Sequence, residues 1–134
     1  MIINAVGLGA IPRLSLCHTR VDEAIALRYV RFLDLTGCQI EDVAPLAGMH
    51  TLDLSYNVLV KNVQALYGLH ALYLVGTKVE DVSMLGALHT LDLSRSLVRH
   101  VGQLRNLNRL VLKRMIHDIT DIETVSCVPN LVLV

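Results

Sequence analysis

The stretch VEDVSMLGALHTLDLS (Val79–Ser94) repeats a stretch that lies 39 residues earlier, IEDVAPLAGMHTLDLS (Ile40–Ser55), with ten of sixteen positions identical. Both contain two leucines separated by one residue. This Leu-x-Leu pair occurs seven times in the chain, at intervals of 19, 19, 20, 19, 19 and 21 residues. The pairs are Leu14/Leu16, Leu33/Leu35, Leu52/Leu54, Leu72/Leu74, Leu91/Leu93, Leu110/Leu112 and Leu131/Leu133. A fixed period of about 20 residues predicts a solenoid whose turns bury their apolar side chains against one another.

The spacing of apolar residues changes within each turn. Val79, Val82 and Leu85 are three residues apart, whereas Leu91 and Leu93 alternate with polar residues. A spacing of three is typical of 3₁₀-like backbone, and alternation is typical of a short strand whose leucines face one way. We therefore expect one strand and one short 3₁₀ or irregular segment in each turn.

A small or polar residue follows the second leucine of each pair by three positions. Stacked turns would bring these residues into a ladder, where their side chains can satisfy the backbone groups of the bend. The ladder comprises Thr19, Cys38, Asn57, Thr77 and Ser96. Met115 occupies this position in the last complete turn, which also carries two extra residues, so we expect a looser bend there.

The segments LHTLDLSRSLV and MHTLDLSYNVL resemble the L-x-x-L-x-L-x-x-N/C/T-x-L signature of leucine-rich repeats, and the resemblance spans essentially the whole chain. EDVSMLGALHTLDL is most similar to the internalin-like and SDS22-like classes. The resemblance implies an α/β solenoid (leucine-rich repeat) with a parallel β-sheet on the concave face and short 3₁₀ or irregular turns on the convex face. Residues 1–134 would form a single domain of five complete repeats with partial repeats at both ends. Most repeats have 19 residues, whereas those classes have roughly 22.

Composition argues against several classes of protein. Twelve basic and twelve acidic residues give a net charge of zero, which argues against nucleic-acid binding and against polybasic attachment to a membrane. No stretch approaches the roughly 20 apolar residues of a transmembrane helix, and the apolar N-terminus lacks the positive region of a signal peptide. The three cysteines are widely spaced, which favours free thiols in a reducing compartment. We therefore expect a cytoplasmic protein.

Binding residues are expected at the positions that the repeat leaves free on the concave sheet. Three columns are predicted to face solvent there: the residues before, between and after the two leucines of each pair. The predicted partner-binding residues are Phe32, Asp34, Asp53, Tyr73, Asp92 and Arg109. They would form an acidic groove, flanked by aromatic anchors, for a basic segment of another protein. Alternatively, the aspartates belong to the repeat consensus and bond nearby hydroxyls such as those of Thr51 or Thr90.

His50, His70 and His89 occupy one column, two positions before the first leucine. About 5 Å apart on adjacent turns, they are near enough in principle to share a metal. However, one histidine per turn is expected to fan outward on a curved solenoid. We therefore interpret these histidines as solvated turn residues and predict no metal site, with a metal or pH-sensing role as the alternative. Asp42 and Asp81 are predicted to cap the backbone of the convex turns.

The sequence shows no nucleophile–base pair and no glycine-rich phosphate loop. It therefore predicts a non-catalytic protein–protein interaction module that uses no cofactor. The alternative is a structural protein that self-assembles through its terminal strands. The sequence begins in mid-repeat and ends inside NLVLV (Asn130–Val134) without a capping unit, and an open strand edge can pair with a second copy.

Overall fold

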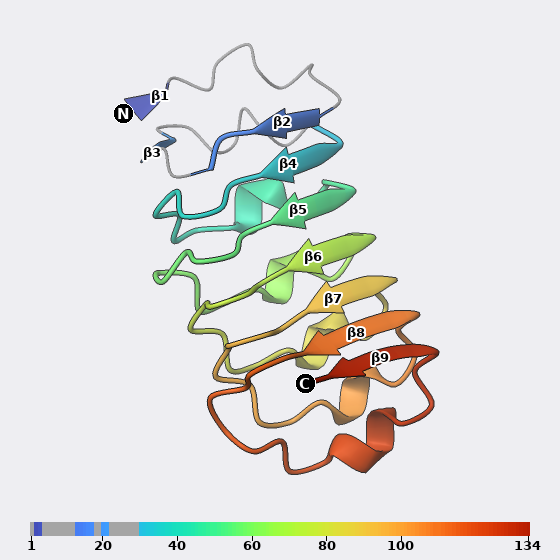
Figure 1. Cartoon of the computed structure of the whole chain (residues 1–134). Helices are drawn as coiled ribbons and strands as arrows, with labels where there is room; N and C mark the ends of the chain where they lie inside the picture. The colour runs from blue at the N-terminus through green and yellow to red at the C-terminus, as the bar shows by residue number, and fades with distance from the viewer. Residues whose placement is uncertain (1, 4–12, 18–19, 22–29) are drawn as a thin grey trace.

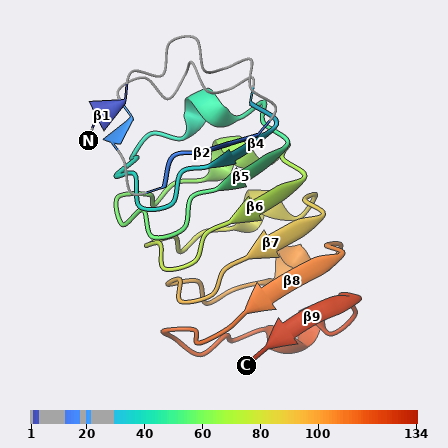
Figure 2. The ribbon, with the colours of Figure 1, turned by 45° about the horizontal axis from the view of Figure 1, so that its top comes forward.

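The computed structural model describes residues 2–3, 13–17, 20–21 and 30–134 (Figure 1). Seven parallel strands form one sheet in the order β2-β4-β5-β6-β7-β8-β9. Their bounds are β2 Arg13–Ser15, β4 Phe32–Asp34, β5 Thr51–Asp53, β6 Ala71–Tyr73, β7 Thr90–Asp92, β8 Arg109–Leu112 and β9 Asn130–Leu133. Figure 2 shows the strands following one another as steps along the solenoid. The predicted parallel sheet is confirmed.

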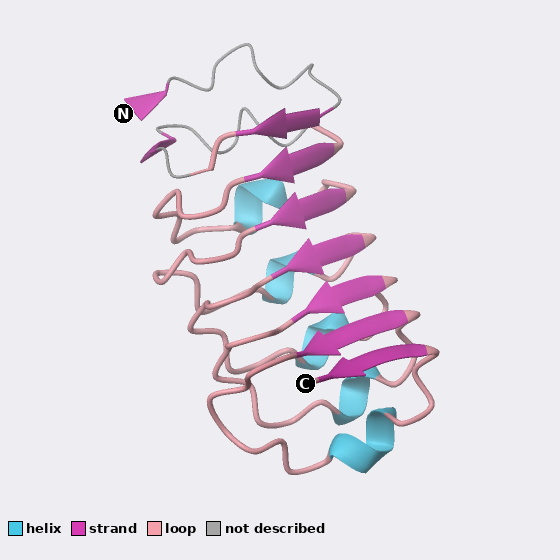
Figure 3. Cartoon of the chain, in the orientation of Figure 1, coloured by secondary structure: helices cyan, strands magenta, loops and turns pink. Residues whose placement is uncertain are grey.

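Short 3₁₀ helices stack on the other side of the chain from the sheet (Figure 3). They are η3 Ala44–Leu46, η4 Gln64–Leu66, η5 Ser83–Leu85, η6 Gly102–Leu104 and η7 Ile122–Val125. Each of the first four contributes its last leucine to the core. The change of apolar spacing within the repeat therefore marks the change from strand to 3₁₀ helix.

Strand register follows the repeat. Leu33 pairs with Leu52, Leu52 with Leu72, Leu72 with Leu91 and Leu91 with Leu110. A second, two-stranded parallel sheet joins β1 (Ile2–Ile3) to β3 (Arg20–Val21). Ala5, Leu8 and Ile11 continue from Ile2 the three-residue apolar spacing of the partial N-terminal repeat, and they lie outside the described residues.

Aliphatic side chains fill the interior between the sheet and the 3₁₀ helices. The largest fully buried side chains are all leucines, from Leu33 to Leu91. At about 25 cal/mol for each Å² of apolar area, burial of one leucine stabilises the fold by roughly 1.5–3 kcal/mol relative to exposure. Because each turn touches its neighbours only, this stabilisation is added turn by turn.

The predicted bend ladder lies inside the solenoid at four positions, and its predicted bonding to the backbone is confirmed at three of them, Cys38, Asn57 and Thr77. Thr19 lies outside the described residues. Cys38 donates its thiol to the Leu16 carbonyl at 2.7 Å. The Asn57 amide donates to the carbonyl of Leu35 on the previous turn at 2.8 Å and to that of Leu54 at 2.9 Å, while its oxygen accepts the Ile40 N–H at 3.1 Å.

The next two rungs differ in their hydrogen bonding. Thr77 Oγ1 donates to the Leu74 carbonyl at 2.8 Å. Ser96 is fully buried, but its hydroxyl has no hydrogen-bond partner among the described residues. Met115, at the position where the ladder was expected to break, is half-buried and packs against the core.

A residue with left-handed backbone turns the chain after each of the strands β4 to β8. It lies two positions after the second leucine and has a φ between 51° and 68°. These residues are Gly37, Tyr56, Gly76, Arg95 and Arg114. A side chain in this region costs roughly 1–2 kcal/mol, so the three non-glycine bends carry local strain.

Aspartates cap the convex turns as predicted. Asp42 Oδ1 accepts the Ala44 N–H at 3.0 Å, and Asp81 Oδ1 accepts the Ser83 N–H at 2.9 Å. Asn62 makes the same contact with the Gln64 N–H at 3.0 Å. These bonds satisfy N–H groups that a helix start otherwise leaves unpaired.

The turn before η6 is capped differently. His100 stands where the other turns have Asp or Asn. The carboxylate of Asp121, one turn later, accepts the N–H groups of Val101 and Gly102, both at 2.8 Å.

None of the helices in the described residues has the length and the apolar composition of a membrane-spanning segment.

Candidate functional site

The concave row consists of the side chains between the paired leucines. Its acidic residues are Asp34, Asp53 and Asp92, and Tyr73 lies between Asp53 and Asp92. Register places Asp34 directly beside Asp53 and Tyr73 directly beside Asp92. All four side chains are half-buried. The structure therefore brings these four predicted site residues together in one line across four neighbouring strands.

Each aspartate of the row is held by the backbone of its own strand end. Asp53 Oδ1 accepts the Ser55 N–H and Asp92 Oδ1 accepts the Ser94 N–H, both at 2.9 Å. Asp34 Oδ1 accepts the N–H of Thr36 at 3.0 Å and its hydroxyl at 2.6 Å. The three aspartates therefore make local hydrogen bonds, as the alternative interpretation expected.

The partners predicted by that alternative are wrong. The hydroxyls of Thr51 and Thr90 lie 2.9 and 3.0 Å from Nδ1 of His50 and His89, and in the described structure the side chains of Asp53 and Asp92 bond the N–H groups of Ser55 and Ser94 instead. Oδ2 of Asp34 instead accepts a hydrogen bond from the Ser15 hydroxyl at 3.0 Å. The backbone two residues downstream is the common partner, because an Asp side chain readily bonds a nearby N–H.

One carboxylate oxygen of Asp53 and one of Asp92 remain available. The side-chain hydrogen bonds of these two residues in the described structure involve Oδ1 alone. Each Oδ2 can therefore accept a hydrogen bond from a bound cation. Structural and binding roles are compatible here, because they use different oxygens of one carboxylate.

The exposed concave surface is narrower than predicted. Thr51 and Ala71, expected to face solvent, are 7% and 6% exposed. Ser55, Ser94 and Val111 are also buried. Strands only about 4.8 Å apart cover small side chains with their larger neighbours, so the solvent-facing positions are those with longer side chains.

The flanking residues of the predicted groove lie in one column. Phe32 of β4 and Arg109 of β8 both precede the first leucine of their pairs. The guanidinium carbon of Arg13 lies 4.4 Å from the Phe32 ring centroid, in a cation–π contact. One face of this predicted aromatic anchor is therefore already occupied, whereas Arg109 is exposed.

The histidine column, His50, His70 and His89, forms a second surface. The ring centroids are 4.6 Å apart for His50 and His70 and 4.5 Å apart for His70 and His89, with interplanar angles of 24° and 17°. The expectation that these side chains fan outward is wrong, because stacking holds the exposed rings together. Among the described residues no group of three or more His, Cys, Asp or Glu could hold a metal ion.

Protonation of the middle ring is disfavoured. Partial loss of solvent, followed by the charges of His89, His50 and Arg31, lowers the pKa of His70 below its ordinary value. Burial and like charges both oppose the charged imidazolium. His70 is therefore less protonated at neutral pH than an isolated histidine would be.

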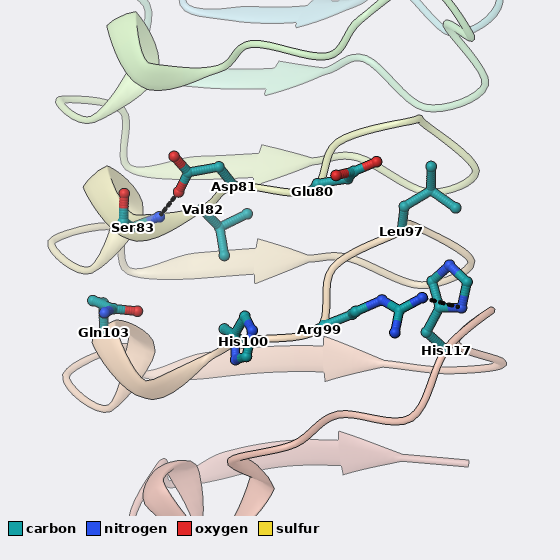
Figure 4. A pocket seen from close by; sticks show the side chains of 9 residues that line it. All are labelled: Glu80, Asp81, Val82, Ser83, Leu97, Arg99, His100, Gln103 and His117. Atoms are coloured by element: carbon teal, nitrogen blue, oxygen red, sulfur yellow. Dashed lines mark hydrogen bonds between the residues drawn. The ribbon is translucent and has the colours of Figure 1, made fainter.

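A polar pocket of about 570 Å³ lies between successive turns (Figure 4). Glu80 and Asp81 line it from one turn, and Arg99 and His100 line it from the next. Arg99 extends toward His117 of a third turn, with Nη2 3.2 Å from Nδ1. The sequence analysis did not predict this pocket, because Glu80 and Asp81 occupy the same repeat positions as Arg99 and His100, so the residues that line it share no side-chain chemistry from turn to turn.

Solved structures decide the classification of the fold. An internalin (InlF) from Listeria monocytogenes has a TM-score of 0.67 and 25% identity over 85% of this chain. Internalin C2 from the same organism has a TM-score of 0.63 and 19% identity over 90% of this chain. This chain is a leucine-rich-repeat solenoid.

The leucine-rich-repeat chain spans 38% of the InlF chain and 71% of the internalin C2 chain. It also resembles the functional domain of InlJ from Listeria monocytogenes, which includes a cysteine ladder, with a TM-score of 0.54 and 16% identity; the match covers 79% of this chain and 30% of that one. The bend ladder described above has one cysteine, Cys38. No protein-family model and no curated protein matches the chain.

Proposed function

We propose that this leucine-rich-repeat solenoid is a non-catalytic protein-interaction module that binds a basic, extended segment of a partner protein across its concave sheet. The observation that carries the proposal is the direct pairing of Asp34 with Asp53 on neighbouring strands. Like charges placed opposite each other on a sheet are unfavourable. A cation between the two carboxylates removes that repulsion.

The rest of the concave row supports a protein partner. Tyr73 offers an amphipathic ring between the Asp34–Asp53 pair and Asp92, and such rings are enriched at protein interfaces. The likeness to internalins supports an interaction module in general. The core leucines fill the interior of the solenoid, which leaves binding to its surfaces.

The test uses two charge-removing variants. Asp53→Asn with Asp92→Asn removes two charges but keeps the oxygen that accepts the Ser55 and Ser94 N–H groups. We expect it to bind a labelled octapeptide of alternating lysine and glycine about tenfold more weakly at low salt, since an exposed ion pair contributes about 0.2–1 kcal/mol. Its affinity should also depend less on ionic strength.

Glu80→Gln and Glu123→Gln together form the matched control, because both glutamates are exposed and lie outside the concave row. This variant has the same net charge as the aspartate variant. If the two variants lose equal affinity, binding depends on net charge and the concave-row proposal is wrong.

Other properties stay predictions from the sequence. They are self-association through the terminal strands, a cytoplasmic location, and the absence of cofactor and nucleic-acid binding. Molar mass by light scattering over a hundredfold concentration range checks the first. A mass that stays at one monomer, 14.8 kDa, would rule out stable self-association.

A further inference from the structure

We propose that the histidine column is a proton-operated docking site for an acidic peptide segment, which binds at acidic pH and is released at neutral pH. The site is distinct from the concave row in both residues and charge. The proposal therefore does not depend on the function proposed above.

The first argument is the shape of the surface. A hollow of about 620 Å³ is lined by His50, His70 and His89 on three successive turns and by Asn106 and Asn108 beyond them. The three rings are exposed and stacked at 4.6 and 4.5 Å. Successive turns thus present a continuous row of ring edges to solvent.

The second argument is hydrogen-bonding capacity. Nδ1 of His50 and Nδ1 of His89 lie within bonding distance of the Thr51 and Thr90 hydroxyls. In the described structure Nε2 of these rings makes no hydrogen bond. When these exposed rings are protonated, Nε2–H is a donor without a partner in the described structure, and charge-assisted donors of this kind bind carboxylates well.

The third argument is the charge around the column. The charges that act on His70 within the described chain come from His89, His50 and Arg31, and all are basic. Asn106 and Asn108 are neutral, as are the threonine hydroxyls. Asp53 and Asp92 follow His50 and His89 by three residues, about 10 Å along the strand. The site therefore becomes strongly positive when its imidazoles take up protons.

Proton linkage gives the direction of the switch. The pKa of His70 is lowered by partial loss of solvent and then by the charges of His89 and His50, because stacked imidazolium ions repel. Carboxylates at the column relieve that repulsion and favour the protonated rings. Binding must therefore take up protons, and affinity must rise as the pH falls through the range in which histidine titrates.

The length of the column selects a peptide. Arg31 occupies the same repeat position as the three histidines, one turn earlier. Four turns spaced by about 4.8 Å extend the basic row over roughly 14 Å. An extended chain carries side chains on one face at intervals of about 6.6 Å, so two or three carboxylates of one segment can reach the row together.

The same stacking argues against a shared metal ion. The lone pair of an imidazole nitrogen lies in the ring plane, so nearly parallel rings direct their lone pairs side by side. A zinc ion needs about 2.0–2.1 Å to each nitrogen, whereas the ring centroids are at least 4.5 Å apart. Two rings would have to leave the stack to bind one ion.

The test measures fluorescence anisotropy of a labelled octapeptide of alternating glutamate and glycine at pH 5.5 and pH 7.5 and constant ionic strength. We expect at least tenfold tighter binding at pH 5.5. The combined variant His50→Gln, His70→Gln and His89→Gln should bind equally weakly at both pH values. His117→Gln, which removes a histidine outside the column, should keep the full pH dependence.

Three results would overturn the proposal: equal affinity of the unaltered protein at the two pH values, equal binding of a glutamine–glycine octapeptide, or tighter binding of an eight-residue oligothymidylate. If the triple variant does not fold, NMR titration of the unaltered protein decides. Addition of the glutamate peptide must raise the pKa of the His70 ring, and an unchanged pKa would contradict the proposal.

Discussion

The Asp121 carboxylate accepts the backbone N–H of Gly102 at 2.8 Å, so a side chain of one turn holds the start of the 3₁₀ helix in the turn before it. The second oxygen accepts the Val101 N–H. His100 occupies the position from which Asp42 and Asp81 cap their own turns. The cap is thus supplied by the following repeat.

Replacing Asp121 by alanine should lower the free energy of unfolding by about 1–2 kcal/mol, the usual cost of losing a helix cap. The reason is that two backbone N–H groups lose their acceptor. Urea denaturation measures the change. Asp118→Ala, at an exposed position three residues earlier, is the matched control and should change stability by less than about 0.5 kcal/mol.

Removing a hydroxyl from the bend ladder should affect stability differently at Ser96 and at Thr77. Ser96→Ala should leave stability unchanged or increase it, because the buried hydroxyl has no partner among the described residues and its removal ends a desolvation cost. Thr77→Val should cost about 1 kcal/mol, because it leaves the bond to the Leu74 carbonyl unmade. Thermal unfolding of both variants provides the comparison, and a larger loss for Ser96→Ala would contradict it.

Gly76 and Gly68 should respond oppositely to alanine. Gly76 has a φ of 68°, and an added Cβ would lie 2.8 Å from Cδ1 of the Tyr56 ring. Gly76→Ala should therefore cost about 1–2 kcal/mol from the left-handed backbone, besides any shift of the ring. Gly68 has no such φ and open space around its Cβ position, so Gly68→Ala should be neutral or stabilising by up to about 1 kcal/mol. Denaturant midpoints of the two variants test the contrast.

Asp81 makes stability depend on pH in the acidic range. The Ser83 backbone N–H, with a smaller contribution from its hydroxyl, lowers the pKa of Asp81 below its ordinary value. The folded state thus favours the carboxylate. This contribution to stability is fully present above the ordinary pKa of an aspartate and is lost as the pH falls through the lowered one.

Urea midpoints at pH 7 and pH 3 measure this effect. Asp81→Asn keeps an oxygen for the Ser83 N–H but cannot titrate, so the stability difference between it and the unaltered protein should shrink at pH 3. Glu80→Gln, the preceding exposed residue, is the matched control. An equal difference at both pH values would show that the Asp81 charge contributes nothing.

Repeat spacing was sufficient to predict the register and the interior. Leu33 pairs with Leu52 because each turn places its leucines at the same height, and the same translation places Cys38 and Asn57 in one ladder. The Asp34–Asp53 pairing follows from the same argument. One-dimensional repetition thus determines which residues become neighbours on adjacent turns.

The cap of η6, the partner of the Thr51 hydroxyl and the stacking of the histidines depend on side-chain geometry, which repeat spacing does not determine. Nothing near His100 indicates that Asp121, 21 residues later, replaces the missing cap. The hydroxyl of Thr51 could bond either Asp53 on its own strand or His50 before it, and the structure selects His50. Likewise, stacking of the exposed imidazoles depends on their rotamers, which the repeat does not specify.

The bonds that fix Asp53 and Asp92 to the N–H groups of Ser55 and Ser94 have a kinetic consequence. A carboxylate already held by its own backbone has little rotamer freedom left to lose when a cation arrives. Association with a basic segment would then require little rearrangement of the sheet, and its rate would be governed by electrostatic attraction. Under the proposed function, the carboxylates of the concave row would be oriented for binding before any partner is present.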